Sequence, residues 1–149
     1  MGKYKELAYS YYNEAISLLE KHKITEAFYQ LKKAVRIYDK DTEILNLLGL
    51  CCYYKCDFER ANLIWKKSLN LKGGDNPAAE YINLLKSKSF KSFLEKFNES
   101  VELIQKEDYS SAEAVLLKVN KKWDELIEPY LLLSLIYMRK KDYKKALKI

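Results

Sequence analysis

Apolar residues recur along most of this chain at intervals of three and four, with charged residues between them. Such spacing places apolar side chains on one face of an α-helix. A clear example lies in residues 58–71, where Ala61, Trp65 and Ser68 form one stripe. The pattern predicts paired helices over residues 3–38, 42–72, 90–120 and 127–149, with a further helix over about 77–88.

A short motif recurs along the same helices at a regular interval. Asp-Phe-Glu-Arg-Ala at residues 57–61 returns as Asp-Tyr-Ser-Ser-Ala at 108–112 and as Asp-Tyr-Lys-Lys-Ala at 142–146, with a weaker copy at 24–27. Ala27 and Ala61 are 34 residues apart, and so are Ala112 and Ala146. A period of this size is typical of a solenoid built from helical hairpins.

The interval between Ala61 and Ala112 is 51 residues, which is 17 more than the period. The additional residues fall at about 76–92, where Ala78, Tyr81 and Ile82 have helical spacing. One interpretation is an extra helix that covers the second hairpin and ends at a break over 87–89. The alternative is one unbroken helix over 77–106.

The second unit resembles the tetratricopeptide repeat (TPR) family, whose pattern alternates bulky and small residues along two helices. The matching residues are Leu45, Leu48, Gly49, Phe58, Ala61, Trp65 and Ser68. The last unit matches at Tyr130, Leu133, Ser134, Tyr137, Tyr143 and Ala146, whereas Cys52 and Gly73 depart from the pattern. The resemblance implies an all-α fold, a right-handed α-solenoid of TPR hairpins with one extra helix between the second and third hairpins. It also implies a single domain over residues 1–149.

Two details of the pattern lead to structural expectations. Gly49 lies inside a helix, where Gly costs about 1 kcal/mol relative to Ala, so we expect a neighbouring helix to approach closely there. The second helix of the fourth hairpin would begin near Tyr143, which leaves it only the seven residues 143–149. A truncated fourth hairpin would leave the preceding helix uncovered, which predicts a longer array or self-association through that helix.

The resemblance also implies a function, because TPR proteins are mostly protein-interaction scaffolds. The first helix of each hairpin lines a concave groove, in which we expect a protein or peptide partner to bind. Tyrosine suits such a surface, since it combines an apolar ring with a hydrogen-bonding tip. The predicted partner-binding residues are Tyr9, Tyr12, Ile16, Glu43, Asn46, Leu50, Tyr53, Phe97, Val101, Leu131, Leu135 and Met138. The alternative interpretation is that many of them belong to the core.

The formal net charge of +6, from 27 basic and 21 acidic residues, adds a second function hypothesis. A basic helical repeat can bind nucleic acid. Only three basic residues are arginines, however, and the lysines are spread over the chain. The predicted groove positions are apolar and differ between units, whereas RNA-reading repeats place matched polar residues in each unit. This difference favours a peptide, with a structural self-assembly module as a further alternative.

Other chemistry finds little support in the sequence. The pattern predicts Cys51, Cys52 and Cys56 within one helix, and His22 is the only histidine, so we expect neither a disulfide framework nor a metal site. The chain has no glycine-rich phosphate loop and no nucleophile–base pair at a readable spacing. We therefore expect a non-catalytic protein without a cofactor. No apolar stretch predicts a membrane span or a signal peptide, which favours a soluble, cytoplasmic protein.

Overall fold

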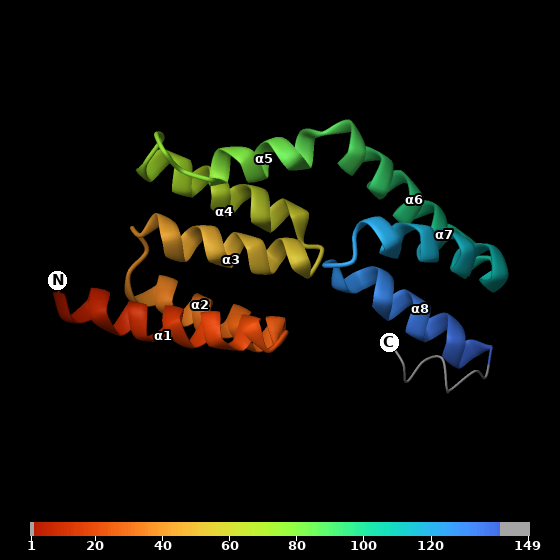
Figure 1. The fold of residues 1–149 in the computed structure, drawn as a ribbon, viewed down its shortest axis with the longest axis horizontal. Coiled ribbons are helices and arrows are strands. Elements are labelled where there is room, and N and C mark those ends of the chain that lie inside the picture. Colours follow the sequence, from red (N-terminus) through yellow and green to blue (C-terminus); the bar gives the residue numbers. More distant parts are fainter. Residues whose placement is uncertain (1, 141–149) are drawn as a thin grey trace. The chain divides into compact units, whose positions relative to one another are not determined.

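The computed structural model describes residues 2–140, and these residues form α-helices without a β-strand (Figure 1). Their contacts divide the chain into two compact units, Met1–Leu85 and Lys86–Ile149, which are described separately below. Whether the chain behaves as a single domain stays a prediction. None of the helices in the described part combines the length and apolarity needed to cross a bilayer.

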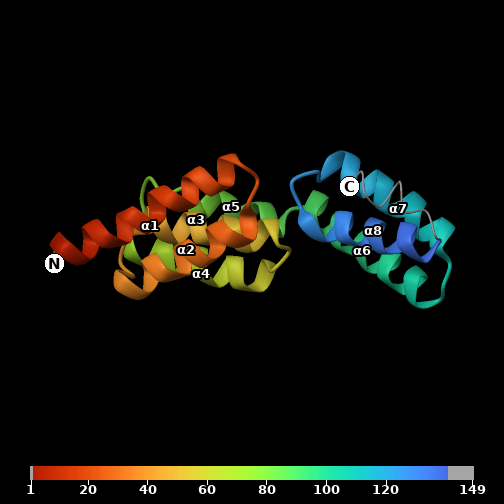
Figure 2. The same cartoon turned by 90° about the horizontal axis from the view of Figure 1, so that it is seen from below.

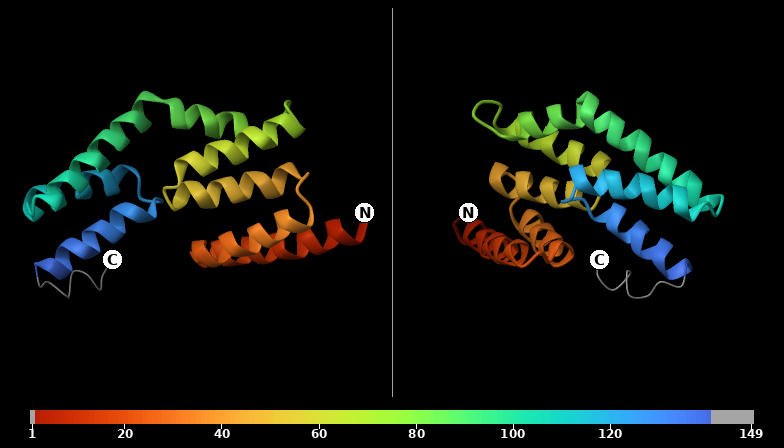
Figure 3. Two further views of the ribbon diagram at one scale, coloured as in Figure 1. Left: turned by 180° about the vertical axis from the view of Figure 1, so that it is seen from behind. Right: turned by 45° about the vertical axis from the view of Figure 1, so that its right-hand side comes forward.

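The first unit contains two helical hairpins followed by one more helix. Its helices are α1 (Gly2–Glu20), α2 (Ile24–Ile37), α3 (Thr42–Tyr54), α4 (Phe58–Leu71) and α5 (Ala78–Lys86). The helices α1 and α2 run alongside each other (Figure 2), and α3 lies between that hairpin and α4 (Figures 1 and 3). The helix α5 is the extra helix that the 51-residue interval predicts, so that prediction is confirmed.

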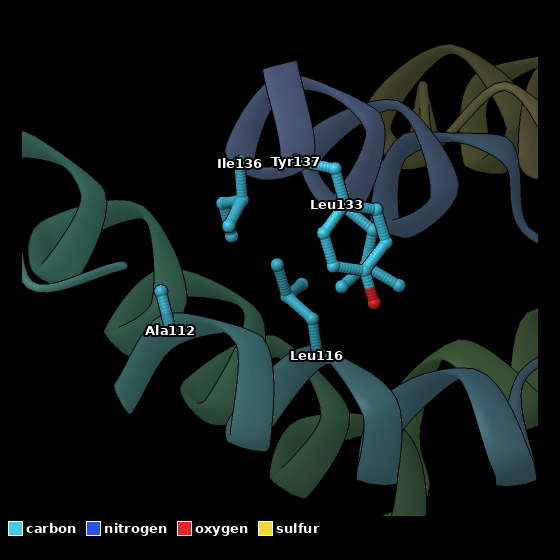
Figure 4. Packing of buried hydrophobic residues seen from close by; sticks show 5 residues of the cluster. All are labelled: Ala112, Leu116, Leu133, Ile136 and Tyr137. Carbon is cyan, nitrogen blue, oxygen red and sulfur yellow. The ribbon is translucent and has the colours of Figure 1, made fainter. Parts of the chain in front are cut away.

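The second unit contains α6 (Lys88–Gln105), α7 (Tyr109–Lys122) and α8 (Ile127–Arg139), and α7 contacts both of the others. Its core is a cluster formed by Ala112 and Leu116 of α7 with Leu133, Ile136 and Tyr137 of α8. Figure 4 shows Leu116 pointing across the interface toward α8. The predicted second helix of the fourth hairpin lies outside the described residues.

The turns inside the hairpins repeat in backbone conformation as well as in sequence. His22, Cys56 and Glu107 adopt positive φ angles of 59°, 65° and 62°. Their spacings of 34 and 51 residues equal those of the sequence motif. After each one, a backbone N–H bonds to the carbonyl five residues back, which closes the preceding helix as in a Schellman motif. These bonds are Lys23 N to Leu18 O, Asp57 N to Cys52 O and Asp108 N to Leu103 O, at 2.8–2.9 Å.

The aspartates of the motif begin the second helix of their hairpins. Asp57 Oδ1 accepts from Arg60 N at 3.2 Å, and Asp108 Oδ1 accepts from Ser111 N at 3.3 Å. An aspartate in this position satisfies a backbone N–H that the first helical turn leaves unpaired. In the first hairpin Lys23 takes the same place and makes no side-chain cap. The weaker copy of the motif thus lacks the capping group.

The break between α5 and α6 falls at Ser87. Its hydroxyl oxygen accepts from Phe90 N at 3.1 Å, so Ser87 caps the start of α6. Its φ of −69° and ψ of 153° are extended rather than helical. Of the two interpretations of residues 77–106, the structure therefore has two helices.

The crossing of α3 and α4 depends on the absence of a side chain at Gly49. A Cβ atom there would lie 2.2 Å from Trp65 Nε1 and 2.6 Å from Trp65 Cδ1. The indole of Trp65 is 1% exposed, and its Nε1 donates to Asn46 O at 3.2 Å. The close helix approach predicted at Gly49 is confirmed.

We expect Gly49→Ala to lower the free energy of unfolding, although Ala is the better helix former. The propensity gain is about 1 kcal/mol, whereas overpacking costs up to about 3 kcal/mol. Since the indole cannot move away without losing its hydrogen bond, the net loss should be about 2 kcal/mol. Urea unfolding followed by circular dichroism measures it.

Gly74→Ala is the matched control, because a Cβ atom at Gly74 meets no atom within 4 Å and its φ is not positive. That variant should stay within about 0.5 kcal/mol of the wild type. A net stabilisation by Gly49→Ala would contradict the tight crossing.

Candidate functional site

A surface hollow of about 320 Å³ lies in the first unit, and we name it the tyrosine hollow. It is formed by α1, α3, α5 and the turn that precedes α5. Its lining residues are Tyr12, Thr42, Glu43, Asn46, Leu47, Leu50, Lys72, Asp75, Asn76, Pro77 and Tyr81. Four of the predicted partner-binding residues, Tyr12, Glu43, Asn46 and Leu50, are brought together here. Apolar walls and a few polar groups are typical of ligand sites.

Asn76 holds the turn that forms one wall of the tyrosine hollow. Its Oδ1 accepts from Asn46 Nδ2 at 2.8 Å and from Ala78 N at 3.0 Å. Its Nδ2 donates to Ser68 Oγ and to Lys72 O, both at 3.0 Å. One side chain therefore connects α3, the end of α4 and the start of α5. On α5, the ring of Tyr81 packs on the ring of Trp65 of α4, with centroids 5.1 Å apart.

Asn46 is the polar residue of the hollow with an unmet hydrogen bond. The residue is only 8% exposed, and its Oδ1 has no hydrogen-bond partner, although its Nδ2 is bonded to Asn76. A buried polar atom without a partner costs about 1–3 kcal/mol. The oxygen itself is shielded from solvent, so a ligand N–H would reach it only after neighbouring side chains of the hollow move.

The α1 side of the site is held by a second polar contact. The hydroxyl of Tyr9 donates to Asp41 Oδ2, while Asp41 Oδ1 caps α3 by accepting from Ile44 N at 3.0 Å. Burial raises the pKa of Tyr9, and the bond to Asp41 raises it further. Burial, Glu43 and Asp41 likewise raise the pKa of Tyr12. Both phenols therefore stay protonated at neutral pH and remain hydrogen-bond donors.

Three predicted residues of this unit, Tyr9, Ile16 and Tyr53, lie outside the lining of the hollow. Ile16 is half-buried. Tyr53 is 4% exposed and packs against Phe58 and Trp65, with ring centroids 5.7 Å and 6.3 Å away. Tyr53 therefore offers little side-chain surface to a partner in this structure.

The predicted residues of the second unit divide into two groups. Phe97 and Val101 of α6 are half-buried, and Phe97 packs against the core cluster. Leu131, Leu135 and Met138 of α8 are 54%, 37% and 54% exposed. Their spacing of four and three residues places them on one helix face. The binding role of all twelve predicted residues stays a prediction.

Comparisons with solved structures support the architecture. The chain is similar to residues 41 to the end of MamA from Desulfovibrio magneticus RS-1, with 22% identity and a TM-score of 0.50 over 95% of this chain and 89% of that one. It is similar to the ArsTM double mutant of MamA from RS-1 by the same measures. The fold is TPR-like. The predicted all-α solenoid class is thus confirmed. No protein-family model and no curated protein matches the sequence.

Within this TPR-like fold, sequence reasoning missed the wall of the tyrosine hollow that follows α4. Asn76 and Tyr81 come from the inserted turn and helix, which have no place in the repeat pattern, and Lys72 directly follows α4. The one available signal was Asn76, which directly precedes Pro77 and the predicted helix. The side chain of a turn asparagine often bonds to the backbone two residues further along the chain.

The cysteines of α3 are unsuited to chemistry at neutral pH. Cys51 and Cys52 are buried. Burial raises the pKa of the Cys51 thiol to about 12 and that of the Cys52 thiol to about 11. A thiol is reactive as the thiolate, so both thiols are inert in this environment. Among residues 2–140 there is no group of three or more His, Cys, Asp and Glu side chains that could hold a metal ion.

Proposed function

We propose that the chain is a non-catalytic protein-interaction scaffold that binds an extended peptide segment of a partner in the tyrosine hollow. The observation that carries the proposal is the hollow itself, which is lined by two tyrosines, two leucines and Asn46, whose buried Oδ1 is unpaired. A peptide supplies one backbone N–H per residue, and one of these would donate to Asn46 Oδ1 once the side chains that shield this oxygen have moved. A side chain of the peptide would pack against Tyr12 and Tyr81, over Leu47 and Leu50.

The TPR-like fold supports this proposal, because helical-repeat proteins present extended concave surfaces for binding. The buried Asn46 Oδ1 without a partner lowers the stability of the unbound protein. When a donor from the peptide pairs with this oxygen, the free-energy cost is removed, and this removal adds to the free energy of binding. The site should therefore favour binding over the stability of the unbound protein.

The test begins with peptides selected on the wild-type protein from a random display library. We expect Tyr12→Ala and Asn46→Leu each to weaken binding of the selected peptides at least tenfold, which is about 1.4 kcal/mol. Fluorescence anisotropy with labelled peptides measures the dissociation constants. Tyr29→Ala is the control, because Tyr29 is exposed and does not line the hollow.

Asn46→Leu also provides a second readout. It removes the unpaired oxygen together with the bond from Asn46 Nδ2 to Asn76 Oδ1. Because leucine has nearly the same size, the free energy of unfolding should change by no more than about 1 kcal/mol. Stability that holds while binding falls separates a binding role from a structural one. Selected peptides that bind Tyr12→Ala and Asn46→Leu as tightly as the wild type would refute the proposal.

A further inference from the structure

A second hollow of about 360 Å³ lies between α2 and α4, and we name it the arginine hollow. Its lining residues are Phe28, Lys32, Val35, Arg36, Leu48 and Arg60. Leu48 comes directly after Leu47 of the tyrosine hollow. Because each helical residue turns by about 100°, Leu48 points to the opposite side of α3 from Asn46 and Leu50. The two hollows are therefore separate sites.

The arginine hollow combines an apolar floor with a basic rim. Phe28 and Leu48 are buried and Val35 is half-buried, whereas Arg36 and Arg60 are exposed. Two of the three arginines of the chain converge here. Guanidinium groups suit carboxylates because they bind them through two parallel hydrogen bonds.

The positive charges at this site are largely uncompensated within the first unit. Arg36 forms no ion pair or hydrogen bond with the described residues, and Arg60 Nε lies 3.5 Å from Asp57 Oδ2. Lys55 and Lys32 add two cations, whose ammonium groups lie 4.1 Å and 5.3 Å from the centroid of the Phe28 ring. A cation over an aromatic face is held by the charge distribution of the ring.

The buried thiol of Cys52 lies on the same side of α3, and these cations affect its pKa. Cys52 follows Leu48 by one turn and shares its helix face. Burial raises the pKa of Cys52 and Asp57 raises it further, whereas Arg60, Lys55 and Lys32 lower it. Three cations therefore lower the pKa of one buried thiol on this face, and one carboxylate raises it.

We propose that the arginine hollow binds an acidic peptide segment of a partner protein, with one apolar side chain on the floor and flanking carboxylates on Arg36 and Arg60. The apolar floor decides between a peptide and a nucleic acid. A peptide can place a leucine or phenylalanine against Phe28, Val35 and Leu48 while its neighbours carry charge. A phosphate backbone would engage the arginines and leave the floor uncovered. This inference is independent of the peptide proposed for the tyrosine hollow.

The experiment uses a fluorescein-labelled peptide, Glu-Glu-Leu-Phe-Glu-Glu, and the full chain at about physiological ionic strength, where distant charges are screened. We expect saturable binding that Arg36→Gln combined with Arg60→Gln weakens at least tenfold. The matched control combines Lys66→Gln with Lys67→Gln, which removes the same two charges from exposed positions of α4. That control should bind within about twofold of the wild type, because long-range charge effects are small under these conditions.

Three further measurements complete the test. A peptide with Ala-Ala in place of Leu-Phe should bind at least tenfold more weakly, and Tyr12→Ala should leave binding unchanged. If the arginine double variant and the lysine double variant weakened peptide binding equally, net charge alone would explain the effect. That result would overturn the proposal. Absence of saturable peptide binding would overturn it too. So would tighter binding of a single-stranded oligonucleotide that depends on the same two arginines.

Discussion

Trp65→Ala should lower the free energy of unfolding by about 3–5 kcal/mol, as large aromatic deletions in cores do. Trp65 is fully enclosed between α3 and α4, and its ring also contacts Tyr53 and Tyr81. Because small domains have only about 5–15 kcal/mol of stability in total, the variant should be close to unfolding. Urea titration followed by circular dichroism measures the change.

Two companion variants separate the causes of this loss. Trp65→Phe keeps an aromatic ring but loses the hydrogen bond to Asn46 O, so it should cost less than Trp65→Ala. In the Trp65→Ala background, Gly49→Ala should stabilise by about 1 kcal/mol, because only the helix propensity remains. If Gly49→Ala destabilised that background as well, the contact with the indole would not be its cause.

Leu63→Ala is the control on the same helix. Leu63 is 66% exposed, so its removal should change stability by about 0.5 kcal/mol at most. If Leu63→Ala lowered the stability as much as Trp65→Ala, the loss in Trp65→Ala would come from a weaker α4 helix. It would then not come from the lost packing of α4 against α3.

Much of the fold follows from the sequence because each hairpin satisfies local rules. Helical spacing predicted the stripe of Ala61, Trp65 and Ser68, and all three are buried in α4. The period predicted where the extra helix α5 lies. The glycine at position 49 predicted a close crossing, since a helix interior has no other need for it. These features depend on neighbours a few residues apart along the chain.

The candidate site was less accessible from sequence because it depends on side chains from separate elements. Tyr53 has the spacing of a groove residue, yet it is buried against Phe58 and Trp65. The basic residues appeared evenly distributed along the chain. Only the folded chain places Arg36 and Arg60, which are on different helices, around one apolar floor. Periodicity assigns a residue to a helix face, but the packing of other helices decides whether that face is open.

Asn76→Ala should lower the free energy of unfolding by about 2–4 kcal/mol, because it leaves buried polar groups without partners. Ser68 is fully buried and Asn46 is nearly so, and both bond to Asn76. The substitution also removes the acceptor for Ala78 N at the start of α5. Hydrogen exchange should therefore show faster exchange along α5 than in the wild type, in addition to the loss measured by urea unfolding.

Asn76→Asp tests which half of the amide matters. It keeps an acceptor for Ala78 N and Asn46 Nδ2, but it cannot donate to Ser68 Oγ or Lys72 O. We expect a smaller stability loss than for Asn76→Ala, with α5 still protected. Asn70→Ala, at an exposed position of α4, should be close to neutral. Unchanged exchange along α5 in Asn76→Ala would show that the helix is held by the packing of its own side chains, such as Ala78, Tyr81 and Ile82, and not by Asn76. The wall of the tyrosine hollow would then not depend on Asn76.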